Sequence, residues 1–103
     1  MIVGEVSDDG VPIVILKFIG REWSAIIDTG FNGDLELPSE LRGKLNDQPV
    51  GRVKSKLASG QVVEEDAIAT FSPDSQLLIG TNLLGDYFLE IKFASKSVRL
   101  ERE

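Results

Sequence analysis

The sequence predicts a mostly-β fold, closed or sandwich-like, with two short helices. Segments rich in β-branched and aromatic residues recur at close spacing along the chain, which is typical of short strands. Turn-forming Gly, Pro, Asn and Asp residues separate these segments. At 103 residues the chain has the length of one domain. We therefore assign residues 1–103 to a single domain.

The first two predicted strands form a hairpin. Residues 11–18 are rich in β-branched side chains, and Pro12 lies near their start, where an edge strand tolerates proline. Residues 20–22 supply a turn, and residues 23–27 form the second strand.

A short strand and a short helix follow this hairpin. Residues 35–37 are expected to form a strand that stops at Pro38. Ser39 can cap a helix that runs to Leu45, and the four-residue spacing of Leu41 and Leu45 places both side chains on one helical face.

Residues 52–71 are expected to form one long hairpin that projects from the core. Its midpoint, residues 58–61, contains the small and flexible residues that a tight turn requires. Both arms are polar, and we expect charge pairs between them. The charged residues are Arg52, Lys54 and Lys56 on the first arm and Glu64, Glu65 and Asp66 on the second.

The C-terminal part begins with a strand over residues 76–79 that leads into Gly80. Thr81 or Asn82 can cap a short helix over residues 83–84. The last two predicted strands then follow. The first, over residues 89–93, alternates apolar and charged side chains, as a half-buried strand does, and the second covers residues 96–103.

The composition excludes several kinds of chemistry. The chain has no Cys, which excludes disulfides, iron–sulfur clusters and thiol nucleophiles. It also has no His, which removes Ser-His-Asp mechanisms and nearly every zinc site, so we expect no metal and no other cofactor. A formal charge of −6 at pH 7 disfavours binding to nucleic acid. Acid–base chemistry must then depend on carboxylates, Lys or Tyr.

The location of the protein is predicted from features that its sequence lacks. The N-terminal residues do not show the basic stretch and long apolar run of a signal peptide. The longest apolar run, residues 13–16, is far too short to span a bilayer. We therefore expect a soluble, cytoplasmic protein that does not bind membranes.

The candidate chemistry lies at Asp28. An apolar strand runs directly into Asp28, Thr29 and Gly30. Burial of a carboxylate at the end of such a strand is costly unless the group is hydrogen-bonded or paired. Gly30 permits the close approach of another chain. A purely structural alternative is an Asx-type turn that ends the strand.

A second motif favours the catalytic interpretation. Residues 77–84 read Leu-Leu-Ile-Gly-Thr-Asn-Leu-Leu and lie beyond the projecting hairpin. The order of the two motifs around this hairpin resembles the retropepsin-like aspartic proteases, and in particular the small cellular members found in prokaryotes. The resemblance extends over roughly residues 10–100. It implies a closed, retropepsin-like β-barrel (the acid protease fold) with one or two short helices and with the hairpin as a flap.

The resemblance also implies roles for individual residues. Asp28 would be the catalytic carboxylate, with Thr29 and Gly30 as active-site support: Thr29 would bond to its counterpart in a second chain, and Gly30 would let the substrate backbone come close. Gly80 would pack beneath the catalytic loop. The expected substrate-binding residues are Phe31 and Asn32, beside the catalytic loop, and Ser59 and Gly60, at the flap tip.

The number of catalytic carboxylates implies a dimer. The chemistry of this family needs two, and the chain has one Asp-Thr-Gly; Asp34, Asp74 and Asp86 do not lie in a comparable setting. The second carboxylate would come from Asp28 of another copy across a twofold axis. The resemblance therefore implies an aspartic endopeptidase that is active as a homodimer on a peptide or protein substrate.

Three departures from the family pattern keep an alternative open. Phe31 stands where pepsin-like lobes usually have Ser and retroviral enzymes have Ala. Thr81 and Asn32 take the positions of the retroviral Arg–Asp ion pair, and residues 99–103 are highly charged. The alternative is a retropepsin-like domain with weak or lost peptidase activity that serves in dimerisation or peptide binding. A third hypothesis is an unrelated small β-barrel that binds a ligand.

Overall fold

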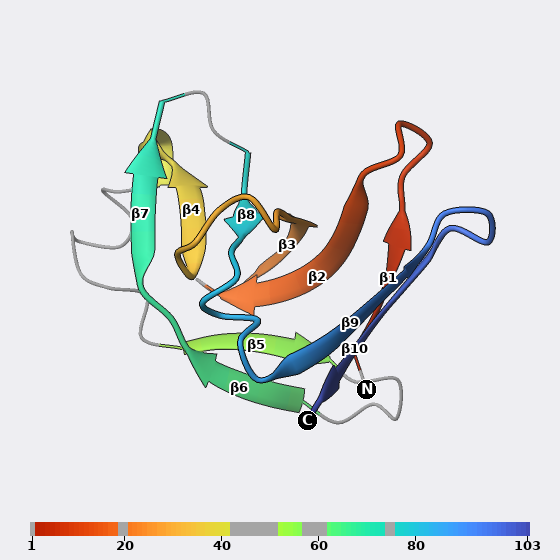
Figure 1. Cartoon of the computed structure of the whole chain (residues 1–103). Helices are drawn as coiled ribbons and strands as arrows, with labels where there is room; N and C mark the ends of the chain where they lie inside the picture. Colours follow the sequence, from red (N-terminus) through yellow and green to blue (C-terminus); the bar gives the residue numbers. More distant parts are fainter. Residues whose placement is uncertain (1, 19–20, 42–51, 57–61, 74–75) are drawn as a thin grey trace.

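The computed structural model describes residues 2–18, 21–41, 52–56, 62–73 and 76–103 (Figure 1). These residues form ten strands in one sheet system. The strands are β1 (Ile2–Val6), β2 (Pro12–Phe18), β3 (Arg21–Ile27), β4 (Leu35–Pro38), β5 (Arg52–Lys56), β6 (Val62–Asp66), β7 (Ala69–Ser72), β8 (Leu78–Ile79), β9 (Tyr87–Lys92) and β10 (Ser97–Arg102). The mostly-β prediction is confirmed.

The strands follow the order β7-β4-β8-β3-β2-β1-β10-β9, and the β5–β6 hairpin attaches to β2. In Figure 1, β1, β9 and β10 lie on one side of the β2–β3 hairpin, and β4, β7 and β8 lie on the other. Among the described strands the pairings run in a line from β7 to β9, so the closed form of the barrel is not confirmed.

The predicted hairpin formed by β2 and β3 is confirmed, and it is the centre of the core. The two strands pair from Ile13 opposite Ile26 to Phe18 opposite Arg21. Val14 on β2 and Ala25 on β3 are buried and alternate with more exposed neighbours, as expected for strands with one face in the core. β3 therefore runs along the core with one face buried.

Strand β1 was not predicted from the sequence. It pairs with β10 from Ile2 opposite Leu100 to Glu5 opposite Ser97, so the two strands nearest the ends of this chain pair with each other. Gly4 interrupts the apolar alternation of β1. A Cβ atom at Gly4 would collide with the Ile13 carbonyl of β2, which explains why this position has no side chain.

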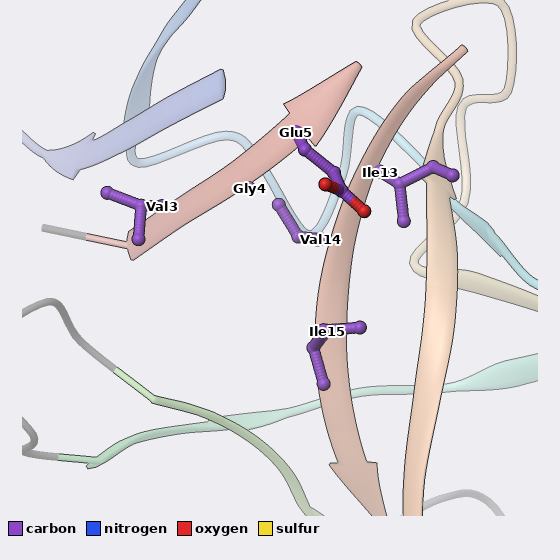
Figure 2. A pocket seen from close by; sticks show the side chains of 6 residues that line it. All are labelled: Val3, Gly4, Glu5, Ile13, Val14 and Ile15. Atoms are coloured by element: carbon purple, nitrogen blue, oxygen red, sulfur yellow. The ribbon is translucent and has the colours of Figure 1, made fainter. Parts of the chain in front are cut away.

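β1 and β2 separate beyond a short paired stretch, and a groove of about 210 Å³ lies between them (Figure 2). The two strands pair only at Glu5 opposite Ile13 and at Val6 opposite Pro12. The side chains of Val3 and Ile15, about half exposed, line the groove, and Glu5 points across it toward β2. Of the predicted site residues that the structure describes, Asp28 to Asn32, none lines this groove.

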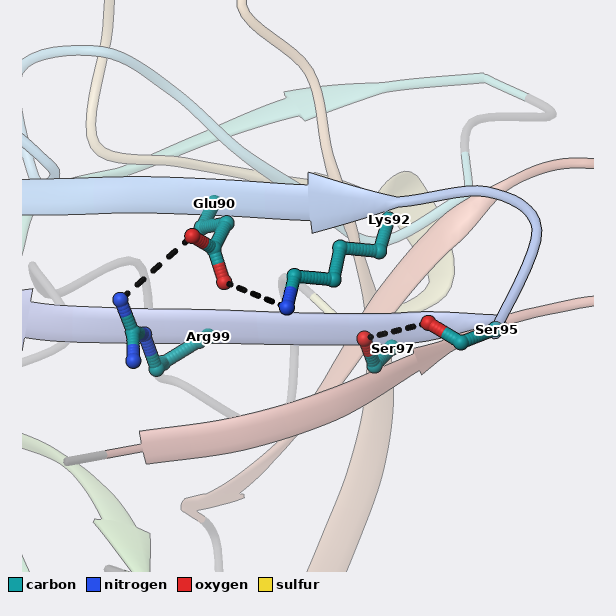
Figure 3. Close-up of polar contacts among 5 residues, drawn as sticks. All are labelled: Glu90, Lys92, Ser95, Ser97 and Arg99. Atoms are coloured by element: carbon teal, nitrogen blue, oxygen red, sulfur yellow. Dashed lines mark hydrogen bonds and ion pairs between the residues drawn. The ribbon is translucent and has the colours of Figure 1, made fainter.

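The β9–β10 hairpin carries a cluster of polar interactions (Figure 3). Glu90 lies between two cations, 3.5 Å from Nη2 of Arg99 and 3.8 Å from Nζ of Lys92. All three side chains are at least one third exposed to solvent, so these ion pairs contribute little to stability.

The expectation of one hairpin over residues 52–71 is wrong in its second half. β5 and β6 do form a hairpin, in which Arg52 lies opposite Asp66 and Lys54 opposite Glu64, as the expected charge pairing requires. Beyond Asp66, however, the chain turns into β7, which pairs in parallel with β4. The predicted turn at residues 58–61, with Ser59 and Gly60, lies outside the described residues.

Neither predicted helix forms within the described residues. Ser39 starts only a single 3₁₀ turn over residues 39–41, and the rest of the first predicted helix lies outside the described part. Residues 81–86 form successive turns, in which the N–H of Leu84 donates to the Gly80 carbonyl over 3.3 Å. The second helix fails because β9 begins at Tyr87, which leaves too few residues for a stable helix.

Candidate active site

Strand β3 carries Asp28 to the edge of the core. β3 and β8 are parallel neighbours, with Ile26 opposite Leu78 and Ile27 opposite Ile79. The N–H of Asp28 donates to the Ile79 carbonyl over 2.9 Å, which continues this pairing by one residue. Because Ile27 and Ile79 are buried, the carboxylate emerges from a fixed, apolar base. Asp28 itself is half-buried.

The Asp28 carboxylate accepts a hydrogen bond from the chain that follows it. The N–H of Gly30 donates to Oδ1 over 2.9 Å, and the N–H of Phe31 donates to the Asp28 carbonyl over 3.1 Å. The Asx-type turn considered from the sequence is therefore present. The hydrogen bond to Oδ1 fixes the orientation of the carboxylate. The turn is therefore compatible with a catalytic role for Asp28.

Thr29 and Gly30 lie exposed at the tip of this turn. A Cβ atom at Gly30 would stand 3.2 Å from Oδ1 of Asp28, so any other residue would crowd the carboxylate. The exposed position of Thr29 agrees with its predicted contact to a second chain. That contact, like the roles of the other predicted site residues, remains a prediction.

The loop after Asp28 is held by the turn that follows β8. The N–H groups of Gly80 and Thr81 donate to the carbonyls of Asp34 and Phe31 over 2.9 and 2.8 Å, and the N–H of Asn82 donates to the Gly33 carbonyl over 3.1 Å. A Cβ atom at Gly80 would collide with the Gly33 carbonyl. The expectation that Gly80 packs beneath this loop is confirmed.

The Phe31 side chain folds back onto the loop instead of extending from it. A Cβ atom at Gly33 would lie 2.6 Å from Cζ of this ring, and one at Gly80 would lie 2.7 Å from Cδ2. The half-buried ring therefore occupies the space that two glycines leave open. Phe31 thus helps to hold the loop, and its predicted contact with substrate remains a prediction.

Asn32 lies beside Thr81, as the comparison with the retroviral ion pair suggested. The Thr81 hydroxyl donates to Oδ1 of Asn32 over 3.5 Å. This long contact at an exposed position is weak. The loop is therefore held mainly by its backbone hydrogen bonds, with little help from this side-chain pair.

Asp34 does not lie in a sequence setting comparable to that of Asp28. In the structure, however, its carboxylate has several partners. Oδ2 accepts the N–H of Ile68 over 2.9 Å, and Oδ1 accepts an amide N–H of Asn82 over 2.6 Å. These partners are 34 and 48 residues away in the sequence, so no local pattern could join them. The available signal was only that Asn82 lies within the second motif and Asp34 lies a few residues beyond the first.

Metal-binding clusters and membrane-spanning helices are absent from the described residues. These residues hold no group of three or more acidic side chains placed to bind a metal ion. No helix within the described ranges is long and apolar enough to cross a membrane. The half-buried carboxylate of Asp28 and the loop that orients it are therefore the candidate active site of this part of the chain.

Known structures share this arrangement of strands. The chain is similar to a retropepsin-like aspartic protease from Rickettsia conorii, with a TM-score of 0.65 and 19% identity over 96% of this chain and 88% of that one. It is also similar to the retroviral protease-like domain of Ddi1 from Leishmania major, with a TM-score of 0.57 and 12% identity over 90% of this chain and 94% of that one. No protein-family model and no curated protein sequence matches the chain. The strand order, the crossing of the Asp28 loop by the Gly80 turn and these similarities together show that this chain has a retropepsin-like fold.

Proposed function

We propose that this chain is an aspartic endopeptidase that works as a homodimer, with Asp28 of each protomer supplying half of the catalytic pair. The observation that carries the proposal is the setting of Asp28. It is half-buried at the end of β3, and its Oδ1 is oriented by the Gly30 N–H. In a retropepsin-like fold this position suits a carboxylate that acts on a bound water.

The need for a second copy follows from the number of suitable carboxylates. Hydrolysis by this route requires two, and the other carboxylate near the loop, Asp34, already binds Ile68 and Asn82. A C2 dimer brings a residue together with its own copy. The exposed tip formed by Thr29 and Gly30 supports a contact between two such loops.

The proposed mechanism rests on the electrostatics of the pair. Two carboxylates about 3 Å apart cannot both ionise, so they share one proton, as is known for aspartic proteases. The ionised Asp28 takes a proton from water while the water oxygen bonds to the peptide carbon, and the protonated Asp28 gives its proton to the carbonyl oxygen. The Asp28 that is now protonated gives its proton to the nitrogen while its ionised partner takes a proton from a hydroxyl of the gem-diol, and the C–N bond breaks to release an acid and an amine.

The substitution Asp28→Asn tests the proposal, because the amide keeps the shape of the side chain and removes its acid–base function. We expect the rate of peptide cleavage to fall by about 100- to 10,000-fold. Asp9→Asn is the matched control, since Asp9 is exposed in the turn between β1 and β2. Cleavage by the Asp28→Asn variant at the parental rate rules out this function.

The alternative is a retropepsin-like domain with weak or lost peptidase activity that serves in dimerisation or peptide binding. The missing Arg–Asp ion pair favours it, because Thr81 and Asn32 at those positions share only a long, exposed contact of 3.5 Å. Binding of a statine-type transition-state mimic separates the two functions. An active site binds the mimic far more tightly than a matched substrate peptide, whereas a binding module does not distinguish them.

A further inference from the structure

Asp34 joins three segments of the chain at one point. Its Oδ2 accepts the N–H of Ile68 over 2.9 Å, its Oδ1 accepts an amide N–H of Asn82 over 2.6 Å, and its backbone carbonyl accepts the N–H of Gly80 over 2.9 Å. Asp34 is itself the last residue before β4. The Asp28 loop, the turn after β8 and the start of β7 therefore meet at this residue.

Ile68 lies at the base of the β5–β6 hairpin. β6 ends at Asp66 and β7 begins at Ala69, so two residues connect the hairpin to β7 along the chain, and on its other side β5 pairs with β2 at Lys54 opposite Lys17. The first of them, Ala67, is buried. Both backbone groups of Ile68 are engaged, because its N–H donates to Asp34 and its carbonyl accepts the N–H of Leu35 over 3.3 Å.

Asn82 binds the Asp28 loop twice. Its backbone N–H donates to the Gly33 carbonyl over 3.1 Å, and its side-chain amide donates to Asp34. A hydrogen bond to an ionised carboxylate is stronger than one between neutral groups. A carboxylate has two acceptor oxygens, so it can accept from Ile68 and Asn82 at the same time.

We propose that Asp34 is a positioning residue that couples the Asp28 loop to the base of the β5–β6 hairpin. The coupling to catalysis rests on the proposed function and on the flap role that the family resemblance implies for this hairpin. Asp34 does not touch the reacting atoms. It holds the hairpin base at a fixed place relative to Asp28, so that the hairpin and the catalytic carboxylate contact the same substrate.

Amide hydrogen exchange tests the link without any need for activity. In Asp34→Ala, the N–H of Ile68 loses its acceptor, and we expect its exchange to become about tenfold faster or more. Asp9→Ala removes the same charge from an exposed turn and is expected to leave this amide unchanged. An Ile68 amide that is equally protected in Asp34→Ala and the parent overturns the proposal.

An exchange of the two side chains tests the pairing even if Asp34→Ala does not fold. Asn82→Asp places two carboxylates at the 2.6 Å contact, so we expect faster exchange at Ile68 and a lower melting temperature. The double variant Asp34→Asn/Asn82→Asp restores one amide and one carboxylate with the partners reversed, and both properties are expected to return toward those of the parent. If the double variant exchanges at Ile68 as fast as Asn82→Asp and melts at the same temperature, the pairing is contradicted.

Steady-state kinetics test the coupling to substrate binding. We expect Asp34→Ala to raise KM for a peptide substrate about tenfold while kcat changes less than about twofold. A purely structural role would lower the folded fraction, and hence the apparent kcat, with KM unchanged. Faster Ile68 exchange with an unchanged KM therefore overturns the coupling.

The outcome for Asp34 can be separated from the outcome for the proposed function. If the parent protein cleaves no peptide, the peptidase proposal fails. Exchange at Ile68 and the side-chain swap still decide whether Asp34 links the two segments. In that case the Kd for a statine-type peptide replaces KM, and an equal Kd for the parent and Asp34→Ala overturns the coupling.

Discussion

At the scale of single residues, the candidate site depends on positions where a side chain has no room. Gly33 and Gly80 both lie against the Phe31 ring, and the Gly33 carbonyl occupies the place of a Cβ atom at Gly80. Gly30 is required for a different reason, since a side chain there would crowd Oδ1 of Asp28. The loop after Asp28 is therefore held by close packing at Gly33 and Gly80 as well as by hydrogen bonds.

The substitution Gly80→Ala is expected to destabilise the protein by about 1–3 kcal/mol, because the new methyl group cannot fit between the Gly33 carbonyl and the Phe31 ring without moving the loop. Thermal or denaturant unfolding measures this change. Gly85→Ala is the comparison and is expected to destabilise the protein less, since the nearest atom to its new methyl group, the Asn82 carbonyl oxygen, would lie 3.3 Å away, against the direct collision at Gly80. Equal stability of Gly80→Ala and the parent contradicts the packing described for the loop.

At the scale of elements, β10 is held on both sides by strands of its own chain. β10 pairs with β1 on one side and β9 on the other, and its apolar residues Val98 and Leu100 are buried within the same chain. The alternation of apolar and charged residues in β10 therefore fits a half-buried strand of one protomer.

Truncation of Leu100 tests how β10 packs. Leu100 is 3% exposed, so we expect Leu100→Ala to lower the free energy of unfolding by about 2–5 kcal/mol. Glu101→Ala, at the exposed next position on the same strand, is expected to change it by less than about 0.5 kcal/mol. Denaturant unfolding of the two variants measures the difference. Similar effects at both positions would mean that Leu100 does not face the core.

At the scale of the whole molecule, the proposed activity belongs to the dimer, because each protomer contributes one Asp28. Activity is therefore expected to depend on the association of two chains. The specific rate should fall when the protein is diluted below the Kd of the dimer, and a size measurement should follow the same transition. A monomer at all active concentrations would exclude a shared site.

Mixing two variants tests the shared site directly. When the parent and Asp28→Asn are combined in equal amounts and allowed to exchange, half of the parental chains are placed in dimers with one intact Asp28. We expect the activity per parental chain to fall to about half by random pairing. The Asp9→Asn variant mixed in the same way should cause no loss. Full retained activity with Asp28→Asn would show that each protomer works alone.

The features that depend on local sequence patterns could be predicted from the sequence. The β2–β3 hairpin and the Asp28 turn were predicted because period-two alternation and turn-forming residues act over a few neighbouring positions. The second predicted helix was wrong for a physical reason: Leu83 and Leu84 pack against the core from a run of turns, and the start of β9 at Tyr87 leaves no length for a helix.

The sequence by itself determined the mostly-β class, the strand that ends in Asp28 and the likeness to a retropepsin-like protease, since each is encoded in contiguous residues. Only the tertiary structure decided that β1 pairs with β10, that the Phe31 ring fills the space over Gly33 and Gly80, and that Asp34 joins Ile68 to Asn82. These contacts join segments far apart in the chain. Which of these segments meet depends on how the strands pair in the sheet, and no short stretch of sequence specifies that pairing.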